Sequence, residues 1–443
     1  MSPRSAGAGS AETGLGIPRA RSGDGEDATL TDGVGSDGLR AGALRVKALL
    51  DRPLASYYLV LGCALLLLGA GLMMVFSAST AYDLDNGLPP YSVFEKQLLG
   101  AVVGLLLMWL AAKSPPRLFR RFAYPLLLGA IGGLVLVLLF GHEVYGAKRW
   151  LSIGGTQVQP SEFAKLALVV WGADVLARKE KLKQLTDWRH VLVPLLLAAG
   201  LMCMLVMIGK DLGTTFLLSV IFLALLWVIG APGKLVIGMV ALMLLALLLL
   251  IAVHPYEWAR ISSFLSSRSP RCRSTTCYQL AQGKDALGSG GVFGVGSGAS
   301  RAKWGSVPNS TTDSIFAILG EELGLVGTLC VVVLYGGLAV AGLRIARRVP
   351  DTFARLCAGA ITVWLTAQAL VNMGAVLGLL PITGVPLPLI SAGVSSLIVT
   401  MVAIGMLMSF ARCEPDAAKA LAASGPNRRR RLISWLGIGY PLR

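Results

Sequence analysis

Long runs of apolar residues, separated by short polar segments, dominate the chain between residues 57 and 411. A run of about 20 apolar residues is what an α-helix needs to cross the ~30 Å apolar core of a bilayer. The pattern predicts ten membrane-spanning helices, at 57–79, 93–112, 123–140, 161–177, 190–208, 212–230, 233–253, 314–342, 353–378 and 388–411. We therefore expect an all-α polytopic membrane protein.

The predicted helices divide the chain into three parts. Residues 1–52, rich in Gly, Ser, Ala and Asp, predict a disordered cytoplasmic tail. Residues 53–412 are the expected ten-helix transmembrane domain, and residues 413–443 are a basic cytoplasmic tail. The connection between helices seven and eight, residues 255–313, is far longer than the others and contains a glycine-dense tract. Elaborate loops on one face of a bundle indicate that function lies on that face.

Composition agrees with a membrane class. Of 443 residues, 55% are hydrophobic and 14% are charged, and the mean hydropathy is +0.69. Soluble domains carry roughly 25% charged residues, so this composition excludes an ordinary soluble protein.

The net charge of +16 lies mainly in short segments between the apolar runs, at 113–121, 178–189, 344–355 and 428–431. The excess of Lys and Arg in cytoplasmic loops orients membrane proteins, so these segments and both termini are expected in the cytoplasm. Anionic lipid is the expected partner of this basic face. No nucleic-acid partner is expected, since no basic and aromatic platform is present.

Cys272 and Cys277 lie close together in the long loop. An oxidising envelope would permit a disulfide between them, and two free thiols are the alternative. The sequence leaves this choice open.

Ionisable residues occur at four places where membrane depth makes them costly, at roughly 2.5–3.5 kcal/mol each on insertion scales. These are Glu162 with Lys165, then Asp211, Asp313, and Glu321 with Glu322. Each has a purely structural explanation. Asp211 and Asp313 precede apolar helices and would cap them. Glu162 and Lys165 would form an intrahelical ion pair, and the glutamate pair would bond neighbouring helices.

Three of the carboxylates, Glu162, Asp211 and Asp313, begin helices at the same predicted face, where Lys148 and Arg149 also lie. They would then line one outward cavity. Arg matches phosphate oxygens bidentately, and a carboxylate can take a proton from a hydroxyl. The set fits a substrate with a sugar, a phosphate and a lipid tail, although a transporter pathway would carry similar charges.

The strings that hold these residues resemble a known family. Gly146–Leu151 and Gln159–Lys165 are similar to signatures of the SEDS proteins (shape, elongation, division and sporulation). Further motifs follow in the expected order, at Asp211–Thr214, Tyr278–Gln279, Thr312–Ala317, Glu321–Gly324 and Gly384–Ser391. The resemblance covers roughly residues 55–412. Trp171–Asp174, followed by Arg178 and Lys179, is more similar to the division branch of an actinobacterium than to the elongation branch.

The resemblance implies a peptidoglycan glycosyltransferase that polymerises lipid II into glycan strands at the outer face of the bacterial cell membrane, at the division septum. A lipid II flippase and a non-catalytic divisome scaffold are the alternatives. The implied partners are a class B penicillin-binding protein, acting as the division transpeptidase, and other divisome proteins bound through the cytoplasmic tails. A divalent cation, Mg²⁺ or Mn²⁺, is a family-level expectation, since no metal-ligand spacing in the sequence indicates one.

The motifs also assign residues. Asp313 matches the family's essential acidic residue and is the expected catalytic base. The expected substrate and cavity residues are Lys148, Arg149, Glu162, Lys165, Asp211, Glu321, Glu322 and Ser391. The chain departs from the family pattern at several places: Lys210 stands where proline is frequent, Thr311 or Thr312 where a histidine is common, and Val394 where a second glycine is usual, and the segment of Cys272 and Cys277 is unusual. Valine does not adopt positive φ cheaply, so a different loop shape is expected there.

Overall fold

A computed structural model describes residues 52–423, except for 86, 88, 90, 145–146, 154–155, 183–187, 254–277 and 305–306. From Pro53 onward the chain forms one compact unit. The predicted N-terminal tail, most of the basic tail, and Cys272 with Cys277 lie outside the described residues.

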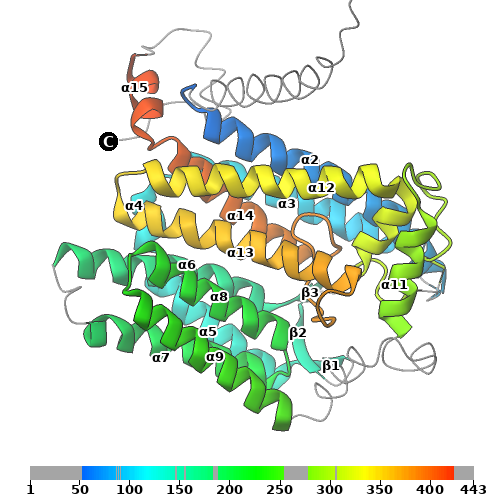
Figure 1. Ribbon diagram of the computed structural model, residues 1–443, viewed down its shortest axis with the longest axis horizontal. Helices are drawn as coiled ribbons and strands as arrows, with labels where there is room; N and C mark the ends of the chain where they lie inside the picture. Colours follow the sequence, from blue (N-terminus) through cyan, green and yellow to red (C-terminus); the bar gives the residue numbers. More distant parts are fainter. Residues whose placement is uncertain are drawn as a thin grey trace, which may run out of the picture. The chain divides into compact units, whose positions relative to one another are not determined.

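The described part of the chain is mostly helical (Figure 1). Each of the ten predicted ranges overlaps one helix. The described helices are α2 (Ala55–Asp85), α3 (Ser92–Lys113), α4 (Pro116–Arg121), α5 (Ala123–Phe140), α6 (Pro160–Lys181), α7 (Trp188–Ile208), α8 (Leu212–Val228), α9 (Gly233–Val253), α11 (Tyr278–Ser289), α12 (Ile315–Arg348), α13 (Thr352–Leu377), α14 (Val394–Ala411) and α15 (Pro415–Ala423).

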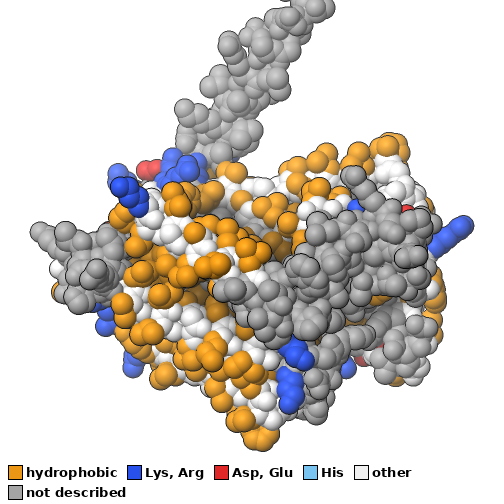
Figure 2. All heavy atoms as spheres, turned by 60° about the horizontal axis from the view of Figure 1, so that its bottom comes forward, with side chains coloured by type: hydrophobic (Ala, Val, Ile, Leu, Met, Phe, Trp, Pro, Cys, Tyr) orange, Lys and Arg blue, Asp and Glu red, His pale blue; other side chains and the backbone are white. Residues whose placement is uncertain are grey.

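Within the described ranges, six helices are long and apolar enough to cross a membrane: α2, α3, α5, α12, α13 and α14. Shorter apolar helices lie at Leu192–Ile208, Leu212–Val228 and Gly233–Ala246. The chain is therefore a multi-pass membrane protein, and the exact number of ten spans stays a prediction. Hydrophobic side chains cover a broad middle section of one face, with Lys and Arg to either side of it (Figure 2). Because lipid is their solvent, apolar side chains can face outward in this section.

Helix α6 is the central element of the bundle. It packs against α5, α8 and α13, and nearly all its residues from Pro160 to Ala177 are buried. A helix that is buried on all sides can carry ionisable groups only where neighbouring helices supply partners. Small residues let other pairs approach closely: at Gly405 of α14, a Cβ would lie 2.4 Å from the Met108 carbonyl oxygen of α3. Such contacts are typical of helices packed in membranes.

A small sheet and a helix break, together with the helices α4, α11 and α15, were not predicted from the sequence. The segment before α6 forms a three-stranded antiparallel sheet in the order β1 (His142–Val144), β2 (Ala147–Ile153), β3 (Thr156–Val158). In addition, α12 is interrupted at Gly324, where φ is 67° and ψ is −162°. The sheet and α11 lie toward the same end of the bundle (Figure 1), which we call the sheet end.

Candidate functional site

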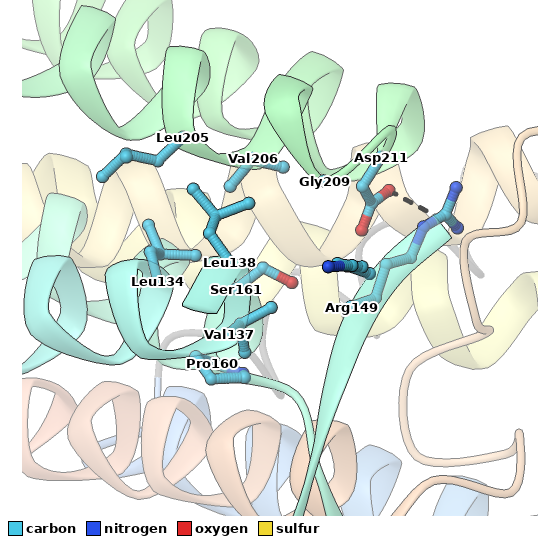
Figure 3. A pocket seen from close by; sticks show the side chains of 11 residues that line it. Leu134, Val137, Leu138, Arg149, Pro160, Ser161, Leu205, Val206, Gly209 and Asp211 are labelled. Carbon is cyan, nitrogen blue, oxygen red and sulfur yellow. Dashed lines mark ion pairs between the residues drawn. The ribbon is translucent and has the colours of Figure 1, made fainter. Parts of the chain in front are cut away.

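Arg149 and Asp211 form an ion pair at the sheet end (Figure 3). Strand β2 presents Arg149, and its Nη1 lies 3.9 Å from Oδ1 of Asp211, which is buried at the start of α8. Arg149 Nη2 also donates to the Lys210 carbonyl. Strand β2 therefore holds the guanidinium of Arg149 against the N-terminus of α8.

The predicted capping role of Asp211 is confirmed. Asp211 is the N-cap of α8, where Oδ1 accepts from the Thr214 N–H at 3.1 Å and Oδ2 accepts from the Thr214 hydroxyl at 2.8 Å. Gln159 Nε2 donates to the same Oδ2 at 3.4 Å. Both oxygens are thus engaged, so Asp211 orients Arg149 and has little capacity to accept a proton from a substrate.

Asp313 and Arg149 both approach Gly384. A methyl group at Gly384 would lie 3.6 Å from Asp313 Oδ2 and 3.7 Å from Arg149 Nη1. Gly384 has a φ of +70°, in the region that glycine adopts without steric cost. The fold thus places a partly exposed carboxylate and a guanidinium around one small space, although they are far apart in the sequence.

The structural explanation offered for Asp313, helix capping, does not account for its position. The N-cap of α12 is Ser314, which makes no side-chain capping bond. Ser314 Oγ instead donates to the Pro308 carbonyl and accepts from Gln279 Nε2 of α11, at 3.1 and 2.9 Å. A small pocket beside Asp313 is lined by residues of α11, α12 and α13, including Gln279 and Ala375.

The backbone around Asp313 is held by polar side chains from two other segments. Ser391 Oγ donates to the Thr312 carbonyl and accepts from the Leu387 N–H, both at 2.7 Å. Asn372 Nδ2 on α13 donates to the carbonyls of Asp313, at 3.0 Å, and Val385, at 2.8 Å. These bonds fix the loop between α13 and α14 against the start of α12, which sets the gap at Gly384.

Glu162 and Lys165 form the predicted ion pair on α6, at 2.9 Å, and both side chains are buried. Lys165 Nζ also donates to Gln368 Oε1 of α13 at 3.0 Å, and Gln368 Nε2 donates to the Pro386 carbonyl at 2.9 Å. Through Gln368, the pair therefore supports the backbone of the loop that contains Gly384. Glu162 Oε2 is buried and has no hydrogen-bond partner among the described residues.

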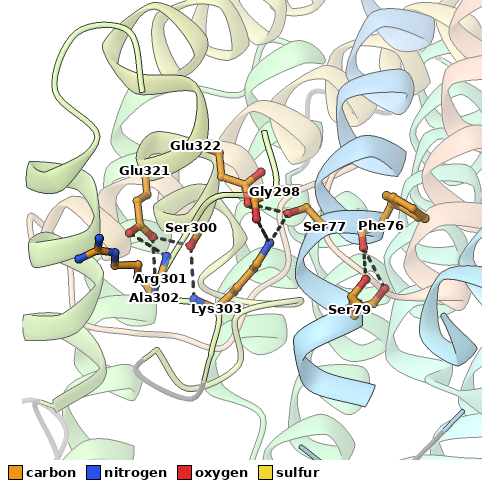
Figure 4. A network of polar contacts seen from close by, with 11 residues as sticks. Phe76, Ser77, Ser79, Gly298, Ser300, Arg301, Ala302, Lys303, Glu321 and Glu322 are labelled. Atoms are coloured by element: carbon orange, nitrogen blue, oxygen red, sulfur yellow. Dashed lines mark hydrogen bonds and ion pairs between the residues drawn. The ribbon is translucent and has the colours of Figure 1, made fainter. Parts of the chain in front are cut away.

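Glu321 and Glu322 belong to a separate network (Figure 4). Glu321 accepts from the backbone N–H of Arg301 and Ala302 and from the Ser300 hydroxyl. Glu322 Oε1 accepts from the Ser77 hydroxyl at 2.5 Å and lies 3.5 Å from Lys303 Nζ. These contacts join α12 to residues 300–303, which directly follow the glycine-rich segment (residues 288–298), and to α2, so the pair holds this loop and makes no described contact with Asp313 or Arg149.

A second pocket adjoins the ion pair (Figure 3). Lys148, Arg149, Ser161 and Asp211 line one part of it, and apolar residues of α5 and α7 line the rest: Leu134, Val137, Leu138, Leu205 and Val206. Cationic and apolar walls in one pocket suit a ligand with a negative group beside a hydrocarbon chain.

Two of the departures from the family pattern, Lys210 and Val394, have different outcomes. Lys210 has a φ of +58°, which proline cannot adopt because its ring holds φ near −65°. The backbone that accepts from Arg149 therefore depends on a non-proline residue here. Val394 is the first residue of α14 and needs no positive φ, so the expected difference in loop shape does not arise from it.

Several polar residues of the site were missed in the sequence. Gln97 of α3 donates to the Ser391 carbonyl at 3.3 Å and accepts from the Gly393 N–H at 3.0 Å. Gln368 and Asn372 lie one helical turn apart on α13, so they share one face. Amides inside otherwise apolar runs are costly unless they are bonded, and this signal was present in the sequence.

A family model described as cell cycle protein, which joins FtsW, RodA and SpoVE, matches residues 57–415. The chain is 39% identical over 391 residues to the probable peptidoglycan glycosyltransferase FtsW of Mycobacterium tuberculosis, covering 88% of this chain and 74% of that protein. It is 33% identical to the same-named protein of Bacillus subtilis, covering 81% of this chain and 91% of that one.

Solved structures are also similar. A chain of a peptidoglycan synthase complex, solved to explain how polymerization and crosslinking are coordinated, superposes with a TM-score of 0.65 at 27% identity, covering 80% of this chain and 97% of that one. The rod shape determining protein RodA of Thermus thermophilus gives 0.58 at 26% identity, covering 83% and 98%. These comparisons confirm the predicted family and the similarity to the division branch of an actinobacterium.

Proposed function

The chain belongs to the FtsW, RodA and SpoVE family of cell cycle proteins, and from this membership and its site we infer that it is a peptidoglycan glycosyltransferase of cell division. It polymerises lipid II into glycan strands at the outer face of the membrane. The observation that carries this proposal is the position of Asp313 and Arg149, each within 4 Å of the same point beside Gly384. A base and a cation in one site are what this glycosyl transfer requires.

The reaction joins two lipid-linked disaccharides. The acceptor hydroxyl oxygen attacks the anomeric carbon of the donor, and the bond from that carbon to the pyrophosphate oxygen breaks. The hydroxyl proton passes to Asp313, and the pyrophosphate leaves on its lipid carrier with the electron pair. Asp313 suits the base because it is partly exposed and lies near Arg149 at Gly384, whereas Asp211 is buried as the cap of α8.

Arg149 and Lys148 stabilise the negative charge that develops on the departing pyrophosphate. The guanidinium donates in a planar fork that matches phosphate oxygens. Its ion pair with Asp211 and its bond to the Lys210 carbonyl hold this fork before substrate binds, which avoids reorganisation during the reaction. The apolar residues of the adjoining pocket then accept the first part of the lipid chain.

We propose a divalent cation only as a bridge to the substrate. Among the described residues, no three His, Cys, Asp or Glu side chains gather as a metal site. Mg²⁺ is commonly held by one or two carboxylates together with substrate phosphates, so one oxygen of Asp313 would hold such an ion while the other accepts the hydroxyl proton. Such an ion would neutralise the charge of the pyrophosphate. In its absence, Arg149 would still hold the pyrophosphate.

We also propose the cellular setting. The similar chain in the peptidoglycan synthase complex supports a class B penicillin-binding protein as the partner of this protein. We propose that this partner is the division transpeptidase. The protein lies in the bacterial cell membrane at the septum, with both termini cytoplasmic. Basic residues at the ends of α4, α6 and α12 support this orientation, since cytoplasmic loops carry the excess of Lys and Arg.

Polymerisation of purified lipid II by the complex with its transpeptidase tests the role of Asp313. Asp313→Ala and Asp313→Asn are expected to lose about 10²–10⁴-fold in rate, the range of general base catalysis, while insertion and thermal stability stay at the wild-type level. Asp285→Asn, which changes an exposed carboxylate of α11, is the matched control and should leave the rate unchanged. Full activity of Asp313→Ala would remove Asp313 from the mechanism.

A further inference from the structure

The break in α12 is closed by backbone bonds from the glycine-rich segment. A break in a helix leaves N–H and C=O groups without intrahelical partners. Here the N–H groups of Leu325 and Val326 donate to the carbonyls of Gly291 and Val292, at 3.0 and 3.2 Å. In return, the N–H groups of Val295 and Gly296 donate to the carbonyls of Glu321 and Glu322, at 3.0 and 3.1 Å. Since an unpaired backbone group costs several kcal/mol in a bilayer, this pairing lets the break lie at membrane depth.

The pairing requires glycine on both sides. A Cβ at Gly290 would lie 2.0 Å from the Gly320 carbonyl oxygen, and a Cβ at Gly294 would lie 2.1 Å from that of Glu322. The segment therefore packs on α12 through its backbone. Its apolar side chains stay outside this contact: Val292, Phe293 and Val295 are 54%, 84% and 46% exposed.

These side chains adjoin the apolar outer face of α12. Leu325, Val326 and Leu329 follow the break directly and are 61%, 55% and 58% exposed. They belong to a helix that is long and apolar enough to cross the membrane, where exposed apolar residues face lipid. The backbone bond between Val326 and Val292 makes the two apolar surfaces continuous.

The length of α12 sets the depth of this surface. Basic residues at a helix end reach the membrane interface, and Arg344, Arg347 and Arg348 lie in the last turns of α12. At 1.5 Å per residue, about 28 Å of helix separates Arg344 from Leu325, close to the ~30 Å thickness of the apolar core. Leu325 and its neighbour Val292 therefore lie at the opposite boundary of the core.

Polar side chains that bond to α12 come from the residues that directly follow the segment. Ser300 and Lys303 bond to Glu321 and Glu322 beneath the loop (Figure 4). Residues 288–298 contain no Asp, Glu, Lys or Arg. The backbone of residues 291–296 is thus bonded to α12, and the large side chains that it exposes, Val292, Phe293 and Val295, are apolar.

We propose that residues 290–298 form a membrane-inserted segment, whose Val292, Phe293 and Val295 contact the boundary between lipid acyl chains and head groups. The partner of this surface is the bilayer itself. Because the Glu321 carbonyl accepts from the Val295 N–H of this segment and belongs to the helix that begins beside Asp313, insertion holds the site at a constant depth relative to a lipid-borne substrate.

Photocrosslinking in nanodiscs of phosphatidylethanolamine and phosphatidylglycerol tests this proposal with the full chain. Phe293→p-benzoylphenylalanine keeps an aromatic ring at an exposed position, so the fold is retained. Leu329→p-benzoylphenylalanine, on the lipid-facing side of α12, is the positive control. Arg301→p-benzoylphenylalanine, in the same loop at an exposed charged position, is the negative control.

Intact-mass analysis after irradiation is expected to show phospholipid adducts at Phe293 at a yield similar to Leu329 and several-fold above Arg301. A yield at Phe293 no higher than at Arg301, with Leu329 labelled, would overturn the proposal. A crosslink from Phe293 to a partner protein in cells, with no lipid adduct in nanodiscs, would overturn it as well. Neither readout depends on polymerase activity, so failure here is distinct from failure of the proposed function.

Discussion

At the scale of single residues, the site depends on a glycine, Gly384, beside its two charged groups. A side chain at Gly384 would contact both Asp313 Oδ2 and Arg149 Nη1, and its φ of +70° is one that other residues adopt at a cost. The carboxylate, the guanidinium and the glycine come from three separate segments. Any substrate atom between base and cation would occupy the space beside Gly384.

Gly384→Ala is therefore expected to lower polymerisation strongly. The added methyl would stand in ordinary contact with both functional groups and displace the substrate, while positive φ costs about 1–2 kcal/mol of stability. Gly230→Ala is the matched control, since Gly230 also has positive φ, at +86°, but nothing lies within 4 Å of its Cβ position. Both variants should lose similar thermal stability, measured in detergent, and only Gly384→Ala should lose activity. Equal activity of the two variants would show that catalysis does not need the open space at Gly384.

At the scale of elements, α12 consists of two helical pieces joined at Gly324. The first piece follows Asp313 and carries Glu321 and Glu322. The second is the apolar part that ends in Arg347 and Arg348. The glycine-rich segment completes the hydrogen bonds of the break, so this junction links the candidate site to the part of α12 that crosses the membrane.

Gly324→Ala should destabilise this junction. Its φ of +67° disfavours any other residue, and the new Cβ would lie 2.4 Å from the Gly294 backbone nitrogen. We expect a loss of at least about 2 kcal/mol, seen as a lower unfolding midpoint in detergent, together with faster chymotrypsin cleavage at Phe293. Gly336→Ala, later in the same helix with open space around its Cβ position, should be neutral. If both variants unfolded alike, the break would not need glycine.

At the scale of the whole molecule, buried charge connects the central helix to the site. Lys165 on α6 bonds to Glu162 on its own helix and to Gln368 on α13, and Gln368 holds the loop that contains Gly384. Lys165 Nζ also lies 5.3 Å from the centre of the Trp364 ring. A change at α6 would therefore reach the space between Asp313 and Arg149 through two side chains.

A double-mutant cycle measures this connection. Glu162→Gln and Lys165→Met each leave the other group charged and buried without its partner, which costs about 3–5 kcal/mol for a buried pair. The double variant removes both charges and should recover most of that stability. Chemical unfolding in detergent gives the stabilities, and lipid II polymerisation gives the activities. Additive losses in the double variant would show that the pair does not interact, and a fully stable and active Glu162→Gln would reduce it to a scaffold.

The sequence by itself determined the membrane class, the position of most helices, the family, and the residues that carry charge near one face. These properties depend on local runs of apolar residues and on short motifs, which neighbouring residues specify without reference to the rest of the chain. The ion pair of Glu162 with Lys165 and the cap formed by Asp211 were predictable for the same reason, because each lies within one helical turn.

Only the tertiary structure decided which charges meet. Arg149 pairs with Asp211, Asp313 and Arg149 both approach Gly384, and Glu321 with Glu322 holds a loop instead of joining them. Ser391 acts in the site because it bonds to the Thr312 carbonyl. The break at Gly324 is stabilised by backbone bonds from a distant segment. Contacts between residues far apart in the chain depend on how helices pack and on close backbone approaches. No local pattern encodes them.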